Sequence, residues 1–238
     1  MEAGFAPDWS VVGSAAARDA LAAIVEAVGM ERRWDGYDAD QDTVRRATLD
    51  LYGCEGRAPA RAELADATGL DVAAVSTALA RLKARDMVVL DPETAEITGA
   101  YPFTERDTGH RVHLGSRVLN AMCAVDALGA GAMYGRDVAI DSACRHCGAP
   151  IRLTTRDNGA ALEDISPPET VVWAGIRYEG QAAGSLCTVI AFFCADAHLD
   201  AWRAENSEAN GFRLSPDEAM QVGKAIFAPL LAPATGSD

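Results

Sequence analysis

The chain has 238 residues, of which 49% are hydrophobic and 24% are charged. This composition is typical of a globular protein with one large or two modest domains, and it excludes an intrinsically disordered chain. The formal net charge of -14 opposes general affinity for nucleic acid, because phosphate binding requires clustered lysine and arginine.

No stretch of 18 residues is both apolar and uncharged, so the sequence predicts no transmembrane helix and no membrane partner. The apolar run near the start follows no basic segment, and we therefore expect no signal peptide. Both features predict a cytoplasmic protein. In that compartment its six cysteines are expected to be reduced thiols, metal ligands or catalytic groups rather than disulfides.

Apolar spacing in the first part of the chain predicts helices over 14–29 and 41–52. Residues 61–90 then have the pattern of a helix, a turn at Gly69, a second helix after Asp71 and a strand, which is typical of a helix-turn-helix with a wing. Five basic residues face four acidic ones between positions 57 and 86. We therefore favour a structural winged-helix-like module that covers the rest of the chain over one that binds DNA.

Residues 95–115 alternate around turn residues as strands do, and they separate this N-terminal module (1–95) from a second domain (96–238). In the second domain, residues 137–155 predict two strands joined by a cysteine-bearing turn, and 169–178 and 185–194 predict buried strands. Two helices close the chain, the last one capped by Ser215 and Glu218. The predicted fold class is α+β, with the helical module packed on a mixed or antiparallel sheet surrounded by helices.

The segment "LNAMCAVDAL", residues 119–128, is predicted to be a buried helix. It places Cys123 and Asp126 three positions apart, and therefore on one helix face. A buried carboxylate without a partner costs several kcal/mol or more, so Asp126 must find a partner or keep its proton. Simple core packing of the thiol, with the acid bonded to a backbone group, explains these ten residues equally well.

A second group of metal-binding residue types is spread along the second domain. Cys144 and Cys147 have the spacing of half a zinc site, and Cys194 with His198 could supply the other half. The two pairs lie about fifty residues apart, which is longer than in compact zinc modules, and a lone CxxC also suits reduced thiols or a redox pair. We assign these four residues a structural role, and zinc is an alternative that the sequence does not favour.

Cys187, in "GSLCTVIAFF", is predicted to lie on a buried strand, where a cysteine usually packs in the core. Gly184 indicates a bend or a close backbone approach just before it. Taken alone, Cys187 therefore carries little functional information.

Taken together, these segments resemble the organomercurial (alkylmercury) lyase family. The resemblance runs from about residue 60 to the last helix, through "AELADATGL", "YPFTERDTGHRVHL", "CAVD", "YGRDVAIDSACRHCGAPI" and "SLCTVIAFF". The family pattern has a cysteine, an aspartate three residues later and a downstream cysteine on a strand ending in Phe-Phe. Here these are Cys123, Asp126 and Cys187, and Cys144 matches a family cysteine considered structural.

The chain departs from the family pattern around these residues. Met122 stands where the family commonly has an aromatic residue, and Thr188, Val189 and Ala191 replace positions that often include a cysteine and a histidine. Cys147 and Cys194 are additions. The three reactive groups are unchanged but the pocket wall is altered, so the sequence does not define the organic group of the substrate.

The resemblance implies cleavage of a carbon–mercury bond by protonolysis. Thiolates are soft ligands that match mercury, and a carboxyl group can deliver a proton to the departing carbon. Asp126 would take a proton from a cysteine and pass it to carbon, leaving Hg(II) bound to Cys123 and Cys187. The implied partners are a small organomercurial, small cellular thiols and a mercuric reductase that accepts Hg(II). No cofactor and no nucleic acid are expected.

Two other hypotheses remain open. The chain could be a metal-binding regulator that uses its helix-turn-helix, which predicts bound metal and DNA binding. It could also be a family homologue repurposed for other metal or thiol chemistry, which predicts intact thiols without protonolysis. Release of hydrocarbon from an organomercurial distinguishes the lyase from both.

Overall fold

The computed structural model describes residues 6–232. Residues 1–5 and 233–238 lie outside the described residues. They include the start of the first predicted domain, the end of the second, and part of the segment used for the signal-peptide prediction. The first elements are η1 (Trp9–Val11), α1 (Ala15–Val28), α2 (Met30–Arg33), α3 (Ala39–Glu55), α4 (Arg61–Thr68), α5 (Val72–Ala84), β1 (Val88–Leu90), β2 (Ile97–Ala100), β3 (Phe103–Thr104), β4 (Arg111–Leu114) and β5 (Arg117–Ala121). The remaining ones are α6 (Ala124–Tyr134), β6 (Val138–Ala143), β7 (Pro150–Arg156), β8 (Ala161–Ser166), β9 (Val171–Gly175), η2 (Cys187–Val189), β10 (Ile190–Phe193), α7 (Asp196–Glu205), β11 (Gly211–Leu214) and α8 (Pro216–Leu231).

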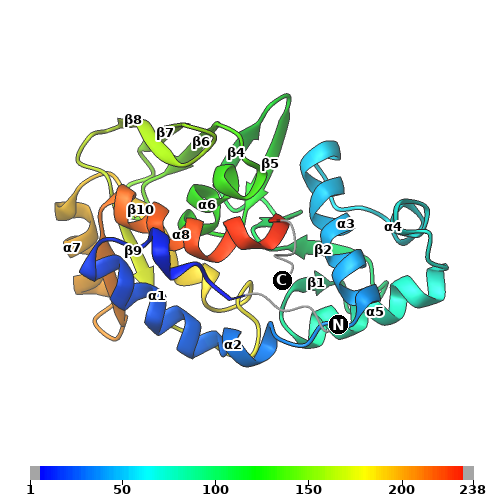
Figure 1. Cartoon of the computed structure of the whole chain (residues 1–238). Coiled ribbons are helices and arrows are strands. Elements are labelled where there is room, and N and C mark those ends of the chain that lie inside the picture. The colour runs from blue at the N-terminus through cyan, green and yellow to red at the C-terminus, as the bar shows by residue number, and fades with distance from the viewer. Residues whose placement is uncertain (1–5, 233–238) are drawn as a thin grey trace.

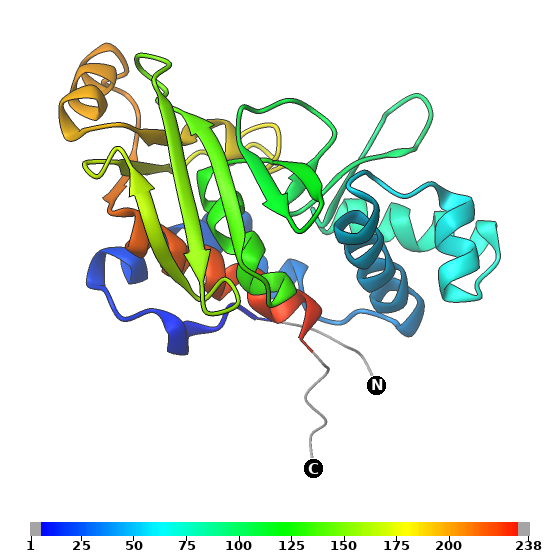
Figure 2. The same cartoon turned by 90° about the horizontal axis from the view of Figure 1, so that it is seen from above.

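Two antiparallel sheets organise these elements. The larger sheet has the strand order β1-β2-β3-β5-β4-β6-β7-β8, and the smaller has the order β10-β9-β11. Figure 2 shows α6 and α8 lying behind the long strands of the larger sheet, whereas α3, α4 and α5 gather at one end of the molecule. The predicted α+β class is confirmed, and all strand pairs within residues 6–232 are antiparallel.

Helices α6 and α8 cross with their backbones in contact (Figure 1). A Cβ atom added to Gly129 would lie 2.6 Å from the carbonyl oxygen of Gly223, and one added to Gly223 would lie 2.6 Å from the carbonyl oxygen of Val125. Both distances are shorter than real Cβ contacts allow, so only glycine fits at either position. This crossing fixes where the N-terminus of α6 lies.

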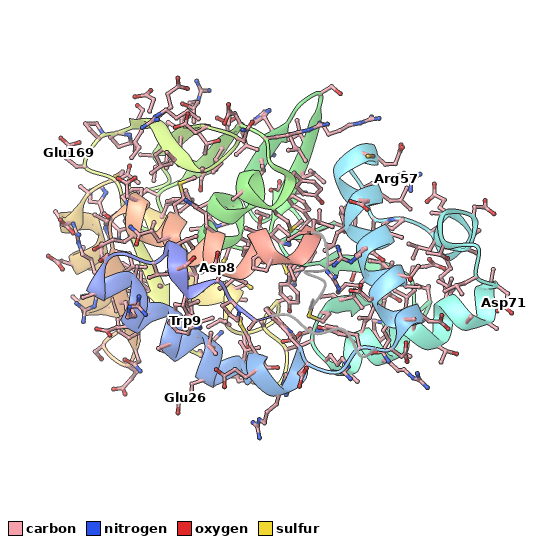
Figure 3. All side chains as sticks on the ribbon, in the orientation of Figure 1. Asp8, Trp9, Glu26, Arg57, Asp71 and Glu169 are labelled. Atoms are coloured by element: carbon pink, nitrogen blue, oxygen red, sulfur yellow. The ribbon has the colours of Figure 1, made fainter. Side chains whose placement is uncertain are left out.

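The N-terminal helices form two groups. Helix α1 packs against α8 and β11, and just before it the amide of Asp8 donates a 2.8 Å hydrogen bond to the carbonyl of Ala225 in α8. Figure 3 shows Asp8 and Trp9 beside α8, whereas Arg57 and Asp71 lie on the α3–α5 group at the other end of the molecule from Glu169. Strand β1 pairs with β2, so the predicted domain boundary at 95/96 falls between two paired strands. The division into two domains stays a prediction.

Several predicted helix ends are confirmed. Helix α1 ends at Gly29 in the left-handed region, with φ of 69°. Asp71 caps α5 by accepting a hydrogen bond from the amide of Ala74. Ser215 and Glu218 form a capping box at the start of α8. Within residues 6–232 no helix combines the length and apolar character that crossing a membrane requires.

Two predicted elements are wrong in their extent. The segment 185–194 is not a continuous strand, because local bonds such as Thr188 N–H to the Ser185 carbonyl form the 3₁₀ helix η2 and leave only Ile190–Phe193 as β10. The segment 119–128 is not helical throughout, because Leu119 pairs with Val112 in the sheet and the helix begins at Ala124. A short apolar run carries no period that separates a buried strand from a buried helix.

We predict that Gly129→Ala lowers the free energy of unfolding by about 1–3 kcal/mol, because the added methyl group forces α6 and α8 apart. Gly13→Ala is the matched control, since its added Cβ would have its nearest neighbour, the Gln221 side chain, at 4.0 Å. Urea denaturation of both variants measures the difference. Equal stability of the two variants would show that the helix crossing tolerates the methyl group.

Candidate active site

The start of α6 brings Cys123 and Asp126 together. Cys123 is the N-cap of the helix rather than a residue within it, and its sulfur accepts a 3.5 Å hydrogen bond from the amide of Asp126. An N-cap side chain points back over the first turn to the third helical residue, which is Asp126. The spacing of three residues therefore brings the thiol and the carboxyl group together, although by capping and not by a shared helix face.

Cys187 reaches the same place from a compact turn between β9 and β10. Its amide donates a 2.8 Å hydrogen bond to the carbonyl of Ala182, which closes the turn just before η2. The sulfur atoms of Cys123 and Cys187 and a carboxylate oxygen of Asp126 all lie within 4.8 Å of one another. We call these three residues the Cys–Asp–Cys site.

The Cys–Asp–Cys site is buried. The exposed fractions are 2% for Cys123, 3% for Asp126 and 7% for Cys187, and Oδ2 of Asp126 has no hydrogen-bond partner. Burial raises the pKa of Asp126 from 3.8 to about 7 and that of Cys123 from 9.0 to about 11. The hydrogen bond with Cys123, followed by burial, raises the pKa of Cys187 well above its ordinary value. Near neutral pH the site therefore holds protons on both sulfurs and can gain or lose one at the carboxyl group.

A cavity of about 40 Å³ adjoins the Cys–Asp–Cys site. Its volume is enough for a small group only, because a single water needs roughly 10–15 Å³ by the same measure. The apolar part of its wall comes from α1, α2 and the residue after it, α6, α8, the segment before β10 and the start of β10. It includes Ile24, Val28, Met30, Trp34, Val125, Leu186, Ile190, Ile226 and Phe227. The N-terminal helices α1 and α2 therefore complete a pocket whose reactive groups belong to the second half of the chain.

Asp86 holds the turn that carries Cys187, and the sequence analysis missed it. This buried carboxylate lies between α5 and β1, and it accepts hydrogen bonds from Tyr101 Oη (2.9 Å), Tyr178 Oη (3.0 Å) and the amide of Ala182 (2.8 Å). Burial raises its pKa, although the three donors oppose that shift. The segment "KARDMVVL" contains no signal for this role, because all three donors are distant in sequence.

The structure also brings together the four residues of the second predicted group, which we call the cysteine–histidine cluster. One ligand atom from each of Cys144, Cys147, Cys194 and His198 lies within 4.8 Å of the others. Burial opposes the thiolate of Cys144, but backbone amides including that of Cys147 donate to it and lower its pKa to about 6. The sixth cysteine, Cys54, is exposed on α3 and belongs to neither group.

The fold and the Cys–Asp–Cys site define an α+β protein that holds two buried thiols beside a proton-carrying carboxyl group, a combination suited to a soft metal. The family model described as "MerB: Alkylmercury lyase" matches residues 103–228. This match covers more than half of the chain and includes both groups of cysteines. The chain therefore belongs to the alkylmercury lyase family, which is a family of enzymes.

Individual relatives agree with this assignment. The alkylmercury lyase of Staphylococcus epidermidis is 29% identical over 70% of this chain and 73% of its own length. The alkylmercury lyase of Pseudomonas putida is 30% identical over 66% of this chain and 76% of its own. The crystal structure of the mercury-bound form of MerB2 superposes with a TM-score of 0.71 at 24% identity, over 92% of this chain and 100% of that one, and it shows the shared fold.

We predict that Asp126 makes the protein less stable as the pH rises. Its pKa is 3.8 when unfolded and about 7 when folded, so its favourable contribution is complete below pH 3.8 and is lost as the pH rises through 7. Between pH 5 and pH 8, wild type should lose about 2–3 kcal/mol of unfolding free energy relative to Asp126→Asn. Urea denaturation at both pH values, with Asp19→Asn as a surface control, measures this difference. Parallel pH dependences of wild type and Asp126→Asn would contradict the raised pKa.

We predict that Asp86→Asn loosens the turn that carries Cys187. An asparagine cannot accept all three hydrogen bonds, and an unsatisfied buried donor costs about 1–3 kcal/mol. Iodoacetamide labelling of Cys187, followed by peptide mass spectrometry, should therefore become at least about tenfold faster. Labelling of the exposed Cys54 is the internal reference, and Glu93→Gln is the surface control. An unchanged ratio of the two labelling rates would mean that Asp86 does not hold the turn.

Proposed function

We propose that this chain cleaves the carbon–mercury bond of small organomercurials by protonolysis, releasing a hydrocarbon and retaining Hg(II). The observation that carries the proposal is the juxtaposition of two thiols and one carboxyl group in a buried site. Membership of the alkylmercury lyase family supports the same reaction.

The first step exchanges thiol ligands on mercury. An organomercurial arrives bound to a small cellular thiol, and one of the two site cysteines replaces that thiol as the ligand. The proton of the site cysteine leaves with the departing small thiol, so no charge is created in the buried pocket. A soft metal can replace the proton of a thiol even where burial raises the pKa of that thiol, because a sulfur–mercury bond forms as the sulfur–hydrogen bond breaks.

The second step breaks the bond to carbon. The other cysteine gives its proton to the carboxylate of Asp126 and binds mercury as a thiolate, which increases the electron density on the carbon. Asp126 then transfers that proton to the carbon, and the electron pair of the carbon–mercury bond becomes the new carbon–hydrogen bond. The hydrocarbon leaves, Hg(II) remains on Cys123 and Cys187 as a neutral dithiolate, and Asp126 is again a carboxylate.

The burial of the Cys–Asp–Cys site favours this sequence of steps. A lone charge is expensive in an apolar pocket, and the mechanism passes through species in which mercury is paired with thiolates. The raised pKa of Asp126 lets one carboxyl group both accept and donate a proton near neutral pH. The small apolar cavity suits a short organic group.

The product Hg(II) would leave with small cellular thiols, or pass to a mercuric reductase, in the cytoplasm. Cys123 and Cys187 are only 2% and 7% exposed, so the acceptor must present a slender thiol that can enter the cavity. The same argument favours small thiols as carriers of the incoming substrate.

We also propose that the N-terminal module is winged-helix-like in architecture but does not bind DNA. Helices α4 and α5 followed by the β1–β2 pair have the order of a winged helix. Two basic side chains at the second helix α5 and its C-cap are used internally. Arg81 in the helix pairs with Asp38 at 2.5 Å, and the C-cap Arg85 donates to backbone carbonyls such as that of Gly36 at 2.7 Å. This use of the arginines, together with the net charge of -14, disfavours the regulator hypothesis.

We predict that Cys123→Ser and Cys187→Ser each abolish hydrocarbon release, and that the double variant is no worse than either, because the two sulfurs act as a unit. Asp126→Asn should still bind mercury but turn over about 10² to 10⁴ times more slowly. Headspace gas chromatography over enzyme, phenylmercury or methylmercury and excess small thiol measures the rates. Cys54→Ser, which changes an exposed cysteine outside the site, should keep the wild-type rate.

Full hydrocarbon release by Cys187→Ser would show that the two sulfurs do not act together. Wild-type protein that binds the organomercurial but releases no hydrocarbon would favour the repurposed homologue. Tight, salt-dependent binding of a fluorescent DNA duplex would instead support the regulator.

A further inference from the structure

The cysteine–histidine cluster joins the two sheets. Cys144 and Cys147 belong to the turn between β6 and β7 of the larger sheet. Cys194 directly follows β10 of the smaller sheet, and His198 lies in the first turns of α7. The sequence separation of about fifty residues, which weighed against a metal site, is therefore bridged by the fold.

Two distances within the cluster match the edges of a tetrahedral metal site. Zinc–sulfur bonds of 2.3 Å and zinc–nitrogen bonds near 2.0 Å imply edges of about 3.8 Å between sulfurs and about 3.5 Å between sulfur and nitrogen. The Cys147 and Cys194 sulfurs are 3.8 Å apart, and the Cys144 sulfur is 3.7 Å from Nδ1 of His198. The 2.9 Å contact between Cys194 and His198 is a hydrogen bond whose proton a metal would replace.

The turn that carries Cys144 and Cys147 is built to hold both sulfurs on one side. The amide of Gly148 donates to the carbonyl of Cys144, and the amide of Cys144 donates to the carbonyl of Ala149, both at 2.8 Å. Gly148 has φ of 74°, which a larger residue would adopt only with strain. The amide of Arg145 donates at 3.0 Å to the carbonyl of Phe192, which ties this turn directly to β10.

Neither core packing nor a disulfide explains the cluster. Cys147 is exposed and Cys194 is only half-buried, whereas a cysteine kept for packing is usually fully buried. The separation of 3.8 Å between their sulfurs is far longer than the bond of about 2.05 Å in a disulfide. Three cysteines and one histidine are a common donor set of structural zinc sites.

We propose that Cys144, Cys147, Cys194 and His198 bind one structural Zn²⁺ ion. All four positions are filled by protein groups, which is the arrangement of a structural site rather than a catalytic one. The ion clamps the β6–β7 turn to the end of β10, the strand that begins three residues after Cys187. Because the four residues of β10 span about 13 Å, this site is separate from the Cys–Asp–Cys site.

The test is the zinc content of the full-length protein, purified without chelator and measured by elemental analysis. We expect about one zinc per chain in wild type, and less than about a fifth of that in Cys147→Ser and in His198→Ala. Cys54→Ser is the matched control for cysteine loss, and Cys123→Ser tests whether the ion instead occupies the other site. Both of these should retain the full zinc content.

A second measurement covers the case in which the cluster variants fail to fold. Wild-type protein stripped with a chelator should have a lower Tm, recover it with one equivalent of Zn²⁺, and give the visible spectrum of tetrahedral cobalt thiolate with Co²⁺. The proposal is overturned if wild-type protein holds no zinc after one equivalent of Zn²⁺ is added. It is also overturned if zinc is lost in Cys123→Ser but kept in Cys147→Ser, or if the cluster takes up Hg²⁺ but not Zn²⁺. None of these outcomes depends on the lyase reaction.

Discussion

The contact between the backbones of α6 and α8 is the constraint from which the active pocket follows. Glycines at 129 and 223 let the two helices approach until a carbonyl oxygen fills the space that a methyl group would need. This approach sets the N-terminus of α6 deep in the molecule, where the N-cap Cys123 and the first-turn Asp126 face the turn that carries Cys187. Helices α1 and α2 then close the pocket over them.

Burial gives this pocket its chemical character. The carboxyl group of Asp126 has an unpartnered oxygen and lies beside two protonated thiols. Burying this group destabilises the fold at neutral pH, but it keeps a transferable proton close to the place where a metal would bind. Strain or desolvation at a functional site must be offset by the surrounding structure. Here the Asp86 hydrogen bonds on one side and the helix crossing on the other hold the three groups in place.

Strand β10 connects the two groups of sulfur ligands. Cys187 precedes the strand and Cys194 follows it, so the proposed zinc ion would anchor the same strand that leads away from Cys187. Each group combines thiols with one titratable partner, but the two partners differ. The buried aspartate of the first suits proton transfer to carbon, whereas a histidine beside three cysteines suits the binding of a structural metal ion.

The sequence by itself determined the local features of this protein. The helices with capping residues, the cysteine-bearing turn and the Cys123–Asp126 pair follow from short-range spacing, and the order of motifs indicated the family. Only the tertiary structure decided that Cys187 lies in a 3₁₀ turn beside Cys123, that Asp86 holds this turn, and that two cysteine pairs about fifty residues apart form one cluster. The physical reason is that caps and turns are made by neighbours in sequence, whereas burial and ligand geometry depend on which distant backbones can pack together.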